Sequence, residues 1–303
     1  MGVRAVVTGG AGFIGSTLVD ALVTRGDEVH VVDDLSSGRR EQVHPDATLH
    51  VADIREPLTG VFGEAQAEVV FHLAAQIDVR LSVADPVADA RSNVLGTLNV
   101  LEAARANEAQ VILASTGGAI YGECDGPADE DAPRLPLSPY GTSKLAAEEY
   151  LATWNRLYGT RHVALRLGNV YGPRQDPHGE AGVVAIFLSR IRDGGEATIY
   201  GDGSQTRDYV FSRDVARAFV GAVGAEGGVF NVGTGEETSV VALWDACLAA
   251  AGKEASAVSG PSRLGELQRS CLDPRRAERT LHWRAEVPLA SGLRDTWEWI
   301  LEE

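Results

Sequence analysis

The chain has 303 residues, of which 44% are hydrophobic and 23% are charged, a composition typical of a globular protein and not of a disordered one. Its formal net charge of −16 argues against broad contact with nucleic acid or an anionic membrane, since both need a dense basic surface. The three cysteines are widely separated, and the seven histidines lack the spacing of paired ligands. We therefore expect neither a disulfide framework nor a bound metal.

The first ten residues, MGVRAVVTGG, contain too short an apolar run for a signal peptide. No segment approaches the roughly 20 apolar residues that a membrane-spanning helix needs. We therefore expect a cytoplasmic protein with no membrane or nucleic-acid partner.

The predicted elements begin with a strand at 5–8, a glycine-rich turn and a helix, in RAVVTGGAGFIGSTLVDAL. Gly9, Gly12 and Gly15 fit the pattern G-x-x-G-x-x-G, and Gly10 in place of Gly9 gives G-x-G-x-x-G. Such glycines permit a tight turn and a close backbone approach, and the helix N-terminus then holds a diphosphate through its unpaired N–H groups. Between a strand and a helix, this motif predicts a dinucleotide site.

The second predicted strand, 29–33, ends in Asp33, eighteen residues after Gly15. This is close to the spacing at which a carboxylate binds the adenosine ribose hydroxyls. A carboxylate repels a 2′-phosphate, so the sequence favours NAD over NADP as the cofactor. Arg39 and Arg40 follow closely and keep NADP as an alternative.

Asp53 and Ile54 follow the next predicted strand and are candidates to flank the adenine, with an ordinary strand-end turn as the other interpretation. The later runs VVFHLA and VILAS are continuously apolar, as expected for strands covered by helices on both faces. Together these runs predict a Rossmann-type, doubly wound parallel sheet. The remaining strand-like runs are 48–51, 69–73, 111–114 and 163–167.

Two predicted helices carry their own start signals. Asp85 and Pro86 open the helix that runs through DARSNVLGTLNVLEAARA, and Ser138 and Pro139 open the helix that Gly159 closes. Both helices are apolar over much of their circumference and need cover on two sides. We therefore expect a homodimer with a four-helix contact.

The character of the sequence changes after about residue 172, where loops rich in Gly, Pro and Asp separate short helices and strands. We expect residues 1–170 to form the NAD-binding domain and residues 171–303 to form a smaller α/β substrate lobe, with some segments returning to the N-terminal domain.

The segment SPYGTSK places Tyr140 and Lys144 four residues apart, on one face of the predicted helix. An ammonium near a phenol, together with a nicotinamide cation, stabilises the phenolate and lowers the phenol's pKa from about 10 toward the working pH. Tyr140 is therefore a candidate general base.

Several motifs occur in the order seen in extended short-chain dehydrogenases/reductases: TGGAGFIG, Asp33, LAAQ, Asn93, STGGAIYG, YGTSK, RLGNVYGP and RDYV. The chain resembles this family over nearly its whole length, and most closely its nucleotide-sugar 4-epimerase branch. The resemblance implies a UDP-sugar substrate, such as UDP-glucose and UDP-galactose, and a bound NAD that takes and returns the hydride on C4. Tyr140 is then base and acid in turn, with Lys144 as its electrostatic partner.

The motifs and the resemblance together imply two sets of site residues, in which Asn169, Arg207 and Arg263 are expected to hold the diphosphate. The cofactor set is Gly9, Gly12, Phe13, Ile14, Gly15, Asp33, Asp34, Ser37, Gly38, Asp53, Ile54, Leu73, Ala74, Ala75, Gln76, Asn93, Tyr140 and Lys144. The substrate set is Thr116, Gly117, Gly118, Tyr140, Asn169, Val183, Arg207, Arg263, Glu266 and Ser270.

The sequence departs from the family at the catalytic hydroxyl. The family's Ser or Thr lies four residues before Tyr121, where this chain has Gly117, and the hydroxyls stand at Ser115 and Thr116. Either one of these two reaches the sugar through an altered loop, or Tyr140 works without a strong hydroxyl partner, or both hydroxyls only satisfy the strand end. We favour Thr116.

Residues 118–120 carry no carboxylate, whereas related dehydratases and decarboxylases have acidic residues there that act as a second acid or base. This favours simple epimerisation, with a 4-ketoreductase as one alternative and a non-catalytic NAD(P)-binding regulator as another. Ser270 matches the position that walls the sugar's C2 pocket. Because serine is small, we predict that UDP-GlcNAc and UDP-GalNAc are also accepted.

Overall fold

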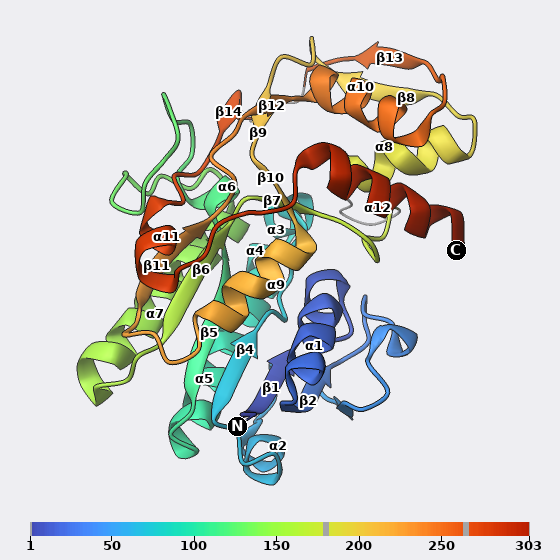
Figure 1. Ribbon diagram of the computed structural model, residues 1–303. Helices are drawn as coiled ribbons and strands as arrows, with labels where there is room; N and C mark the ends of the chain where they lie inside the picture. Colours follow the sequence, from blue (N-terminus) through green and yellow to red (C-terminus); the bar gives the residue numbers. More distant parts are fainter. Residues whose placement is uncertain (1, 178–181, 263–266, 303) are drawn as a thin grey trace.

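The structure, a computed structural model, describes residues 2–177, 182–262 and 267–302. Within these ranges, seven parallel strands form the main sheet in the order β11-β6-β5-β4-β1-β2-β3 (Figure 1). The predicted doubly wound sheet is confirmed, with all six predicted strands in it. The strands are β1 (Arg4–Thr8), β2 (Glu28–Asp33), β3 (Thr48–Val51), β4 (Val69–His72), β5 (Gln110–Thr116), β6 (Val163–Leu167) and β11 (Gly228–Val232).

Helices cover both faces of this sheet, because alternate side chains of each buried strand are apolar on opposite sides. Ala5 and Val7 of β1 pack in one core cluster, and Val6 packs in the other. The first cluster lies under α1 (Phe13–Arg25), α9 (Ser212–Gly221) and α11 (Arg275–Leu281). The second lies under α2 (Thr59–Glu64), α5 (Gly96–Ala106) and α7 (Pro139–Tyr158).

The main sheet draws its last strand from the second half of the chain. β11 pairs with β6 from Gly228↔Val163 to Val232↔Leu167, while α9 and α11 pack on the sheet face next to it. The division of the chain near residue 170 therefore leaves a strand and two helices of the later part on the main sheet.

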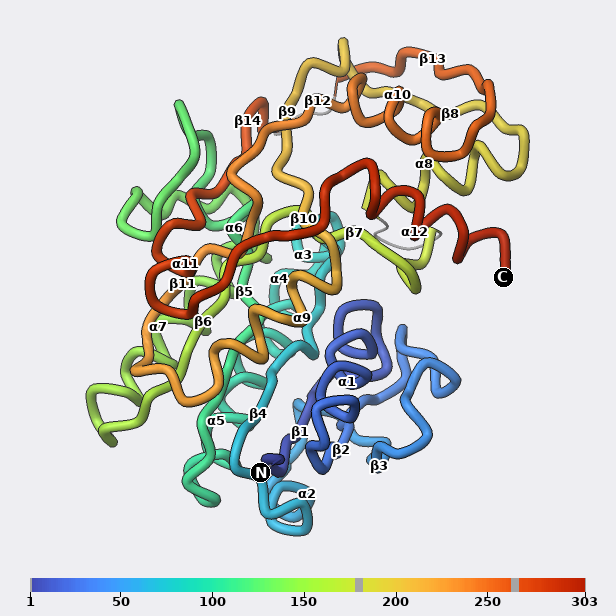
Figure 2. Tube along the Cα trace, viewed as in Figure 1, coloured from blue at the N-terminus to red at the C-terminus, as the bar shows by residue number. Residues whose placement is uncertain are grey.

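The other elements after β6 gather beyond the carboxyl ends of the main strands, as Figure 2 shows. Phe187, Trp244 and Trp297 belong to a third core cluster that joins their helices. These elements are β7 (Asn169–Tyr171), α8 (Val183–Arg192), β8 (Ala197–Tyr200), β9 (Thr206–Arg207), β10 (Tyr209–Phe211), β12 (Thr238–Ser239), α10 (Val240–Ala251), β13 (Ala257–Gly260), β14 (Arg269–Ser270) and α12 (Leu289–Glu302).

The helix predicted from Pro86 onward is not continuous, which corrects the sequence-based expectation. It is divided into α4 (Pro86–Ala90), a π-helical turn over Arg91–Leu95, and α5. A π turn inserts an extra residue into the helical ladder and is frequent at functional sites. Here it contains Asn93, whose side chain is buried. Before it lies α3 (Val79–Ala84), and a short 3-10 turn spans Arg40–Gln42.

Across the described ranges, none of the helices combines the length and apolarity needed to cross a bilayer.

Candidate active site

The turn between β1 and α1 is closed by glycines that leave no room for side chains. Gly9 has a φ of +73°, and a Cβ on Gly15 would lie 2.0 Å from the Gly9 carbonyl oxygen. Gly12 precedes α1 without a side-chain capping bond, and the first turn of α1 carries no acidic residue. The first N–H groups of α1, on Phe13, Ile14 and Gly15, therefore meet no capping side chain, as a diphosphate site requires.

Asp33, at the end of β2, ties the second strand to this turn. Its Oδ2 accepts a hydrogen bond from the Ala11 N–H at 3.0 Å, and its Oδ1 accepts one from the Leu35 N–H at 2.9 Å. Burial raises the pKa of this carboxyl, and the two backbone bonds oppose that rise. A Cβ on Gly38 would lie 2.9 Å from Oδ1, so the loop returns directly over Asp33. The other two predicted residues on this loop, Asp34 and Ser37, are exposed.

Asp53 and Ile54, predicted to flank the adenine, have local partners. The Asp53 carboxylate binds the Arg55 guanidinium within the same turn, which lowers the pKa of Asp53. Ile54 is 7% exposed, and its side chain packs against Gly96 so closely that a Cβ on Gly96 would collide with it. The strand-end turn that the sequence left open is thus present at this position.

The segment 73–76 follows β4 and lies against the glycine turn. The N–H groups of Leu73 and Ala74 donate to the Thr8 carbonyl oxygen at 3.0 Å, and a Cβ on Gly9 would lie 2.6 Å from the Ala74 nitrogen. Leu73, Ala74 and Ala75 are each partly buried. The segment therefore brings its backbone to the side of the predicted cofactor site.

Gln76 is fixed by the residue in the π turn. The Gln76 N–H donates to Asn93 Oδ1 at 2.9 Å, and Asn93 Nδ2 donates to the Gln76 carbonyl oxygen at 2.8 Å. Both side chains also donate to Oδ1 of Asp89, Gln76 at 2.9 Å and Asn93 at 3.0 Å. The π turn thus links the loop after β4 to a buried carboxylate on α4.

Tyr140 and Lys144 lie on successive turns of α7, which Ser138 caps by accepting the Gly141 N–H at 3.1 Å. Lys144 is 4% exposed, and its Nζ donates to the Ala114 carbonyl oxygen on β5 at 3.0 Å. Burial lowers the pKa of Lys144 to about 8, so the ammonium is the dominant form at neutral pH. Burial raises the pKa of the Tyr140 phenol to about 12.

The two adjacent hydroxyls at the end of β5 have different partners. The Thr116 side chain interacts with the Tyr140 phenol, and this interaction lowers the phenol's pKa. The Ser115 hydroxyl donates to Glu148 Oε1 at 2.5 Å. Successive side chains of a strand point to opposite faces, so only one of the two hydroxyls can meet Tyr140.

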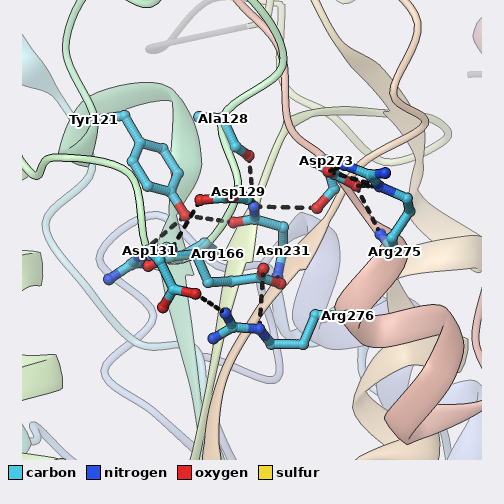
Figure 3. Close-up of polar contacts among 10 residues, drawn as sticks. Tyr121, Ala128, Asp129, Asp131, Arg166, Asn231, Asp273, Arg275 and Arg276 are labelled. Atoms are coloured by element: carbon cyan, nitrogen blue, oxygen red, sulfur yellow. Dashed lines mark hydrogen bonds and ion pairs between the residues drawn. The ribbon is translucent and has the colours of Figure 1, made fainter.

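Behind Ser115 lies a buried ionic network, of which Figure 3 draws the part beyond Glu148. Arg166 on β6 is 1% exposed and binds the Glu148 carboxylate at 2.7 Å. Its Nη1 donates to the Tyr121 hydroxyl at 2.8 Å, which in turn donates to Asn231 Oδ1 at 2.7 Å. The network therefore joins α7 to β6, to the loop after α6 (Gly117–Ile120) and to β11.

The glycine at the family's hydroxyl position is explained by packing. A Cβ on Gly117 would lie 2.4 Å from a methyl carbon of Leu272, whose side chain is 1% exposed. A buried leucine has little room to move, so any side chain at position 117 meets a steric conflict. The space that a serine or threonine would need is already filled.

Three predicted substrate residues converge from different elements. A Cβ on Gly118 would lie 3.7 Å from the Ser270 Oγ and 3.9 Å from the Asn169 Oδ1. These residues come from α6, β14 and β7, so their meeting depends on the folded chain. Gly118 therefore lies next to both polar side chains.

Beside β9 and β14 there is a cavity of about 650 Å³. Arg207 ends β9 and is not among the residues that line this cavity; its Nη1 donates to the Thr206 carbonyl oxygen at 2.8 Å. Val183 begins α8 and is partly buried. Arg263 and Glu266 lie outside the described residues. The cavity is lined by Tyr200, Gly201, Asp202, Gln205, Ser259, Gly260, Pro261, Ser262 and Gln268.

Sequence reasoning missed three residues that build this site: Asp89, Glu148 and Leu272. Asp89 and Glu148 lie four residues from Asn93 and Lys144, one helical turn away, and that spacing is the signal by which they could be found. Leu272 has no local signal, because it reaches Gly117 only through the folded chain. Among the described residues, no group of three or more His, Cys, Asp or Glu side chains is placed to hold a metal ion.

Comparison with known proteins gives a consistent result. A family model described as the NAD dependent epimerase/dehydratase family matches residues 5–233. The chain is 50% identical to a UDP-glucose 4-epimerase of Mycolicibacterium smegmatis, with 98% of each chain covered.

Two solved structures are also similar over 98% of both chains. One is a UDP-glucose 4-epimerase of Thermotoga maritima with UDP-glucose, with a TM-score of 0.95 and 43% identity. The other is a UDP-glucose 4-epimerase of Thermus thermophilus in complex with NAD, with a TM-score of 0.94 and 45% identity.

Proposed function

Since the chain belongs to the NAD-dependent epimerase/dehydratase family and is an NAD-dependent epimerase, we propose that it interconverts UDP-glucose and UDP-galactose by inverting C4. The observation that carries this proposal is the placement of Thr116, Tyr140 and Lys144 at the carboxyl edge of the sheet, beside the glycine turn. Ligands of doubly wound sheets bind at this edge.

The glycine turn and Asp33 fit the cofactor. The uncapped amides of α1 suit its diphosphate, and the Asp33 carboxylate suits the hydroxyls of its adenosine ribose. A bound NAD would supply the hydride acceptor for C4 and, once reduced, the hydride donor for the opposite face of the 4-keto sugar.

Tyr140 moves the proton in this reaction. It takes the proton of the C4 hydroxyl as the hydride leaves, which gives a 4-keto sugar, and it returns the proton when the hydride comes back. Burial raises the pKa of Tyr140 to about 12, so the phenolate needs stabilisation. Thr116 supplies a hydrogen bond and Lys144 supplies positive charge one helical turn away.

α6 supports epimerisation over dehydration. Its residues Gly118, Ala119 and Ile120 bring no acid or base to the sugar. The test is proton NMR of UDP- and dTDP-sugars incubated with the enzyme without added NAD. Inversion at C4 is the expected outcome, and a 4-keto-6-deoxy product would refute the proposal. In a parallel assay with added NAD, release of a 4-keto sugar together with NADH would favour the ketoreductase. No turnover of any sugar in either assay would favour the regulator.

Ser270 supports acceptance of the acetamido sugars as well. Its small side chain lies next to Gly118 and Asn169, where a larger side chain would take up more space. The variant Ser270→Tyr fills this space, so it should retain UDP-glucose turnover and lose UDP-GlcNAc turnover. The prediction fails if wild-type enzyme converts the hexoses and gives no detectable product from UDP-GlcNAc.

We also propose that the chain forms a homodimer through the helices around α7. Leu81, Val87, Leu95, Leu157 and Tyr158 are each more than half exposed, on α3, α4, the π turn and α7. Apolar side chains gathered on neighbouring helices are typical of a protein interface. Sedimentation at micromolar concentration tests this, because a monomer there would contradict it.

A cytoplasmic location is proposed on two grounds. The cysteines Cys124, Cys247 and Cys271 are free thiols, which suits a reducing compartment. The need for NAD points the same way. We also retain the proposed division into a cofactor domain, 1–170, and a substrate lobe, 171–303. Limited proteolysis near residue 170 tests that division.

A further inference from the structure

Asp89 is a buried carboxylate beside the proposed catalytic pair, and no step described above uses it. It lies on α4 and is 1% exposed. Its Oδ1 accepts hydrogen bonds from Gln76 Nε2 at 2.9 Å and from Asn93 Nδ2 at 3.0 Å. Both donors are neutral amides, so neither cancels the carboxylate's charge.

A short chain of contacts leads from Asp89 to the catalytic helix. Asn93 Nδ2 also donates to the Ser143 Oγ at 3.2 Å, and the Ser143 hydroxyl donates to the Tyr140 carbonyl oxygen at 3.0 Å. α4 and the π turn both pack directly against α7. Asp89 is thus fixed in place relative to the turn of α7 that carries Tyr140 and Lys144.

Other ionisable groups also lie around this cluster: Glu148 raises the pKa of Lys144 as Asp89 does, and Arg91 on the π turn is exposed. Glu148 on α7 is bound by Arg166 on β6. His72 on β4 is buried, which lowers its pKa to about 3 and keeps it neutral. On α3, Arg80 lies 3.8 Å from its neighbour Asp78. Within the described part of the chain, Asp89 has no cation within 4 Å.

We propose that Asp89 is a positioning residue that serves as the buried countercharge of the catalytic pair. It orders Gln76 and Asn93 through one oxygen and acts on Lys144 and Tyr140 through space. This inference rests on the proposed function, because it concerns the same proton transfer.

The charge of Asp89 affects both groups in the same direction. Burial lowers the pKa of Lys144 to about 8, and Asp89 opposes that fall. Burial raises the pKa of Tyr140 to about 12, the Thr116 hydrogen bond lowers it, and Asp89 raises it further. While Lys144 keeps its proton, removing the charge makes the phenolate form at lower pH. The same change makes Lys144 lose its proton at lower pH.

Asp89→Asn separates charge from structure. Because both amides donate to Oδ1, an asparagine can keep both hydrogen bonds through its own Oδ1 and remove only the negative charge. In Asp89→Asn enzyme purified with its cofactor, we measure kcat as a function of pH. We expect the acid limb of this profile to lie at lower pH than in the wild type, by about half a unit or more. Asp89→Glu, which restores the charge, should return the limb toward its wild-type position.

Glu149→Gln is the matched control for the removal of a negative charge. Glu149 is exposed on α7 and pairs with Arg134 at the surface, where solvent screens its charge. Its variant should leave the limb in place. An unchanged limb in Asp89→Asn, even with a lower melting temperature, would overturn the proposal because it would leave only a structural role.

A spectroscopic titration separates this proposal from the proposed function. The phenolate absorbance of Tyr140 is obtained by subtracting each protein's Tyr140→Phe partner, in the wild-type and Asp89→Asn backgrounds. A midpoint at lower pH in Asp89→Asn supports the countercharge even if no UDP-sugar is turned over. An unchanged midpoint contradicts the countercharge even if C4 epimerisation is observed.

Discussion

The two sides of the β5 carboxyl end differ in the surroundings that they give to neighbouring hydroxyls. On one side Thr116 meets Tyr140, which lies at a partly exposed position near Lys144. On the other side Ser115 meets Glu148 in a fully buried ionic network. Both side chains carry a hydroxyl, and the alternation of side chains along the strand decides which hydroxyl is available to a substrate.

We therefore expect the Ser115 side to contribute to stability and the Thr116 side to contribute to catalysis. The Ser115 side contains a charge pair whose partners are both within the protein, so its effect should appear in the free energy of unfolding. The Thr116 side contains a phenol whose proton must come and go, so its effect should appear in turnover. Substitutions on each side can test this separation.

The largest expected effect is that of Tyr140→Phe. It removes the only group that we propose to move the C4 proton, so kcat should fall by roughly 10³-fold or more. Stopped assays with UDP-glucose measure the loss, and absorbance of the purified protein checks that the cofactor stays bound. Near-normal turnover in Tyr140→Phe would contradict the proposal that the Thr116 side of β5 is the catalytic side.

Glu148→Gln tests the other side of the strand. It leaves Arg166 buried without its partner charge, so the free energy of unfolding should fall by about 3 to 5 kcal/mol, measured by urea denaturation. The neighbouring Glu149→Gln breaks only an exposed pair and should cost at most about 1 kcal/mol. Equal losses from the two variants would contradict the contrast.

Thr116→Val and Ser115→Ala compare the hydroxyls directly. Loss of the Thr116 hydrogen bond should reduce kcat by about 10²-fold, because it removes a donor to the developing phenolate. Ser115→Ala should change kcat by less than about tenfold and mainly lower stability. The reverse ranking in steady-state kinetics would make Ser115 the catalytic hydroxyl.

The smallest expected effects come from substitutions of the adjacent glycines Gly117 and Gly118. Gly117→Ala places a Cβ against Leu272 and should cost about 1 to 3 kcal/mol in the free energy of unfolding. The Cβ of Gly118→Ala would have its nearest neighbour, the Ser270 Oγ, at 3.7 Å, so this variant should fold normally and raise KM for the sugar. Thermal melts and steady-state kinetics on the two variants distinguish these outcomes.

The sequence was sufficient wherever the signal was local. The strands at 5–8 and 29–33, the glycine turn and the spacing of Tyr140 and Lys144 all follow from short segments of the chain. Their periodicity and turn residues depend on neighbours within one element, so they could be predicted.

The remainder depends on contacts between distant segments. The π turn at Asn93 has no compositional signal, and its helix was predicted as continuous. Leu272 explains Gly117, and Asp89 faces α7, only once the sheet has brought these elements together. Tertiary packing of this kind cannot be inferred from the periodicity of one segment.

The late position of β11 in the sequence has a consequence for how the chain is made. β6 ends at Leu167, but its outer edge gains a partner only when residues 228–232 have been synthesised. Until then the nascent chain presents an unpaired, buried-type strand to solvent, and Arg166 lacks the Tyr121–Asn231 link. Chains that terminate before Gly228 should therefore aggregate during translation, whereas in chains that extend past Val232 this edge of β6 is paired with β11.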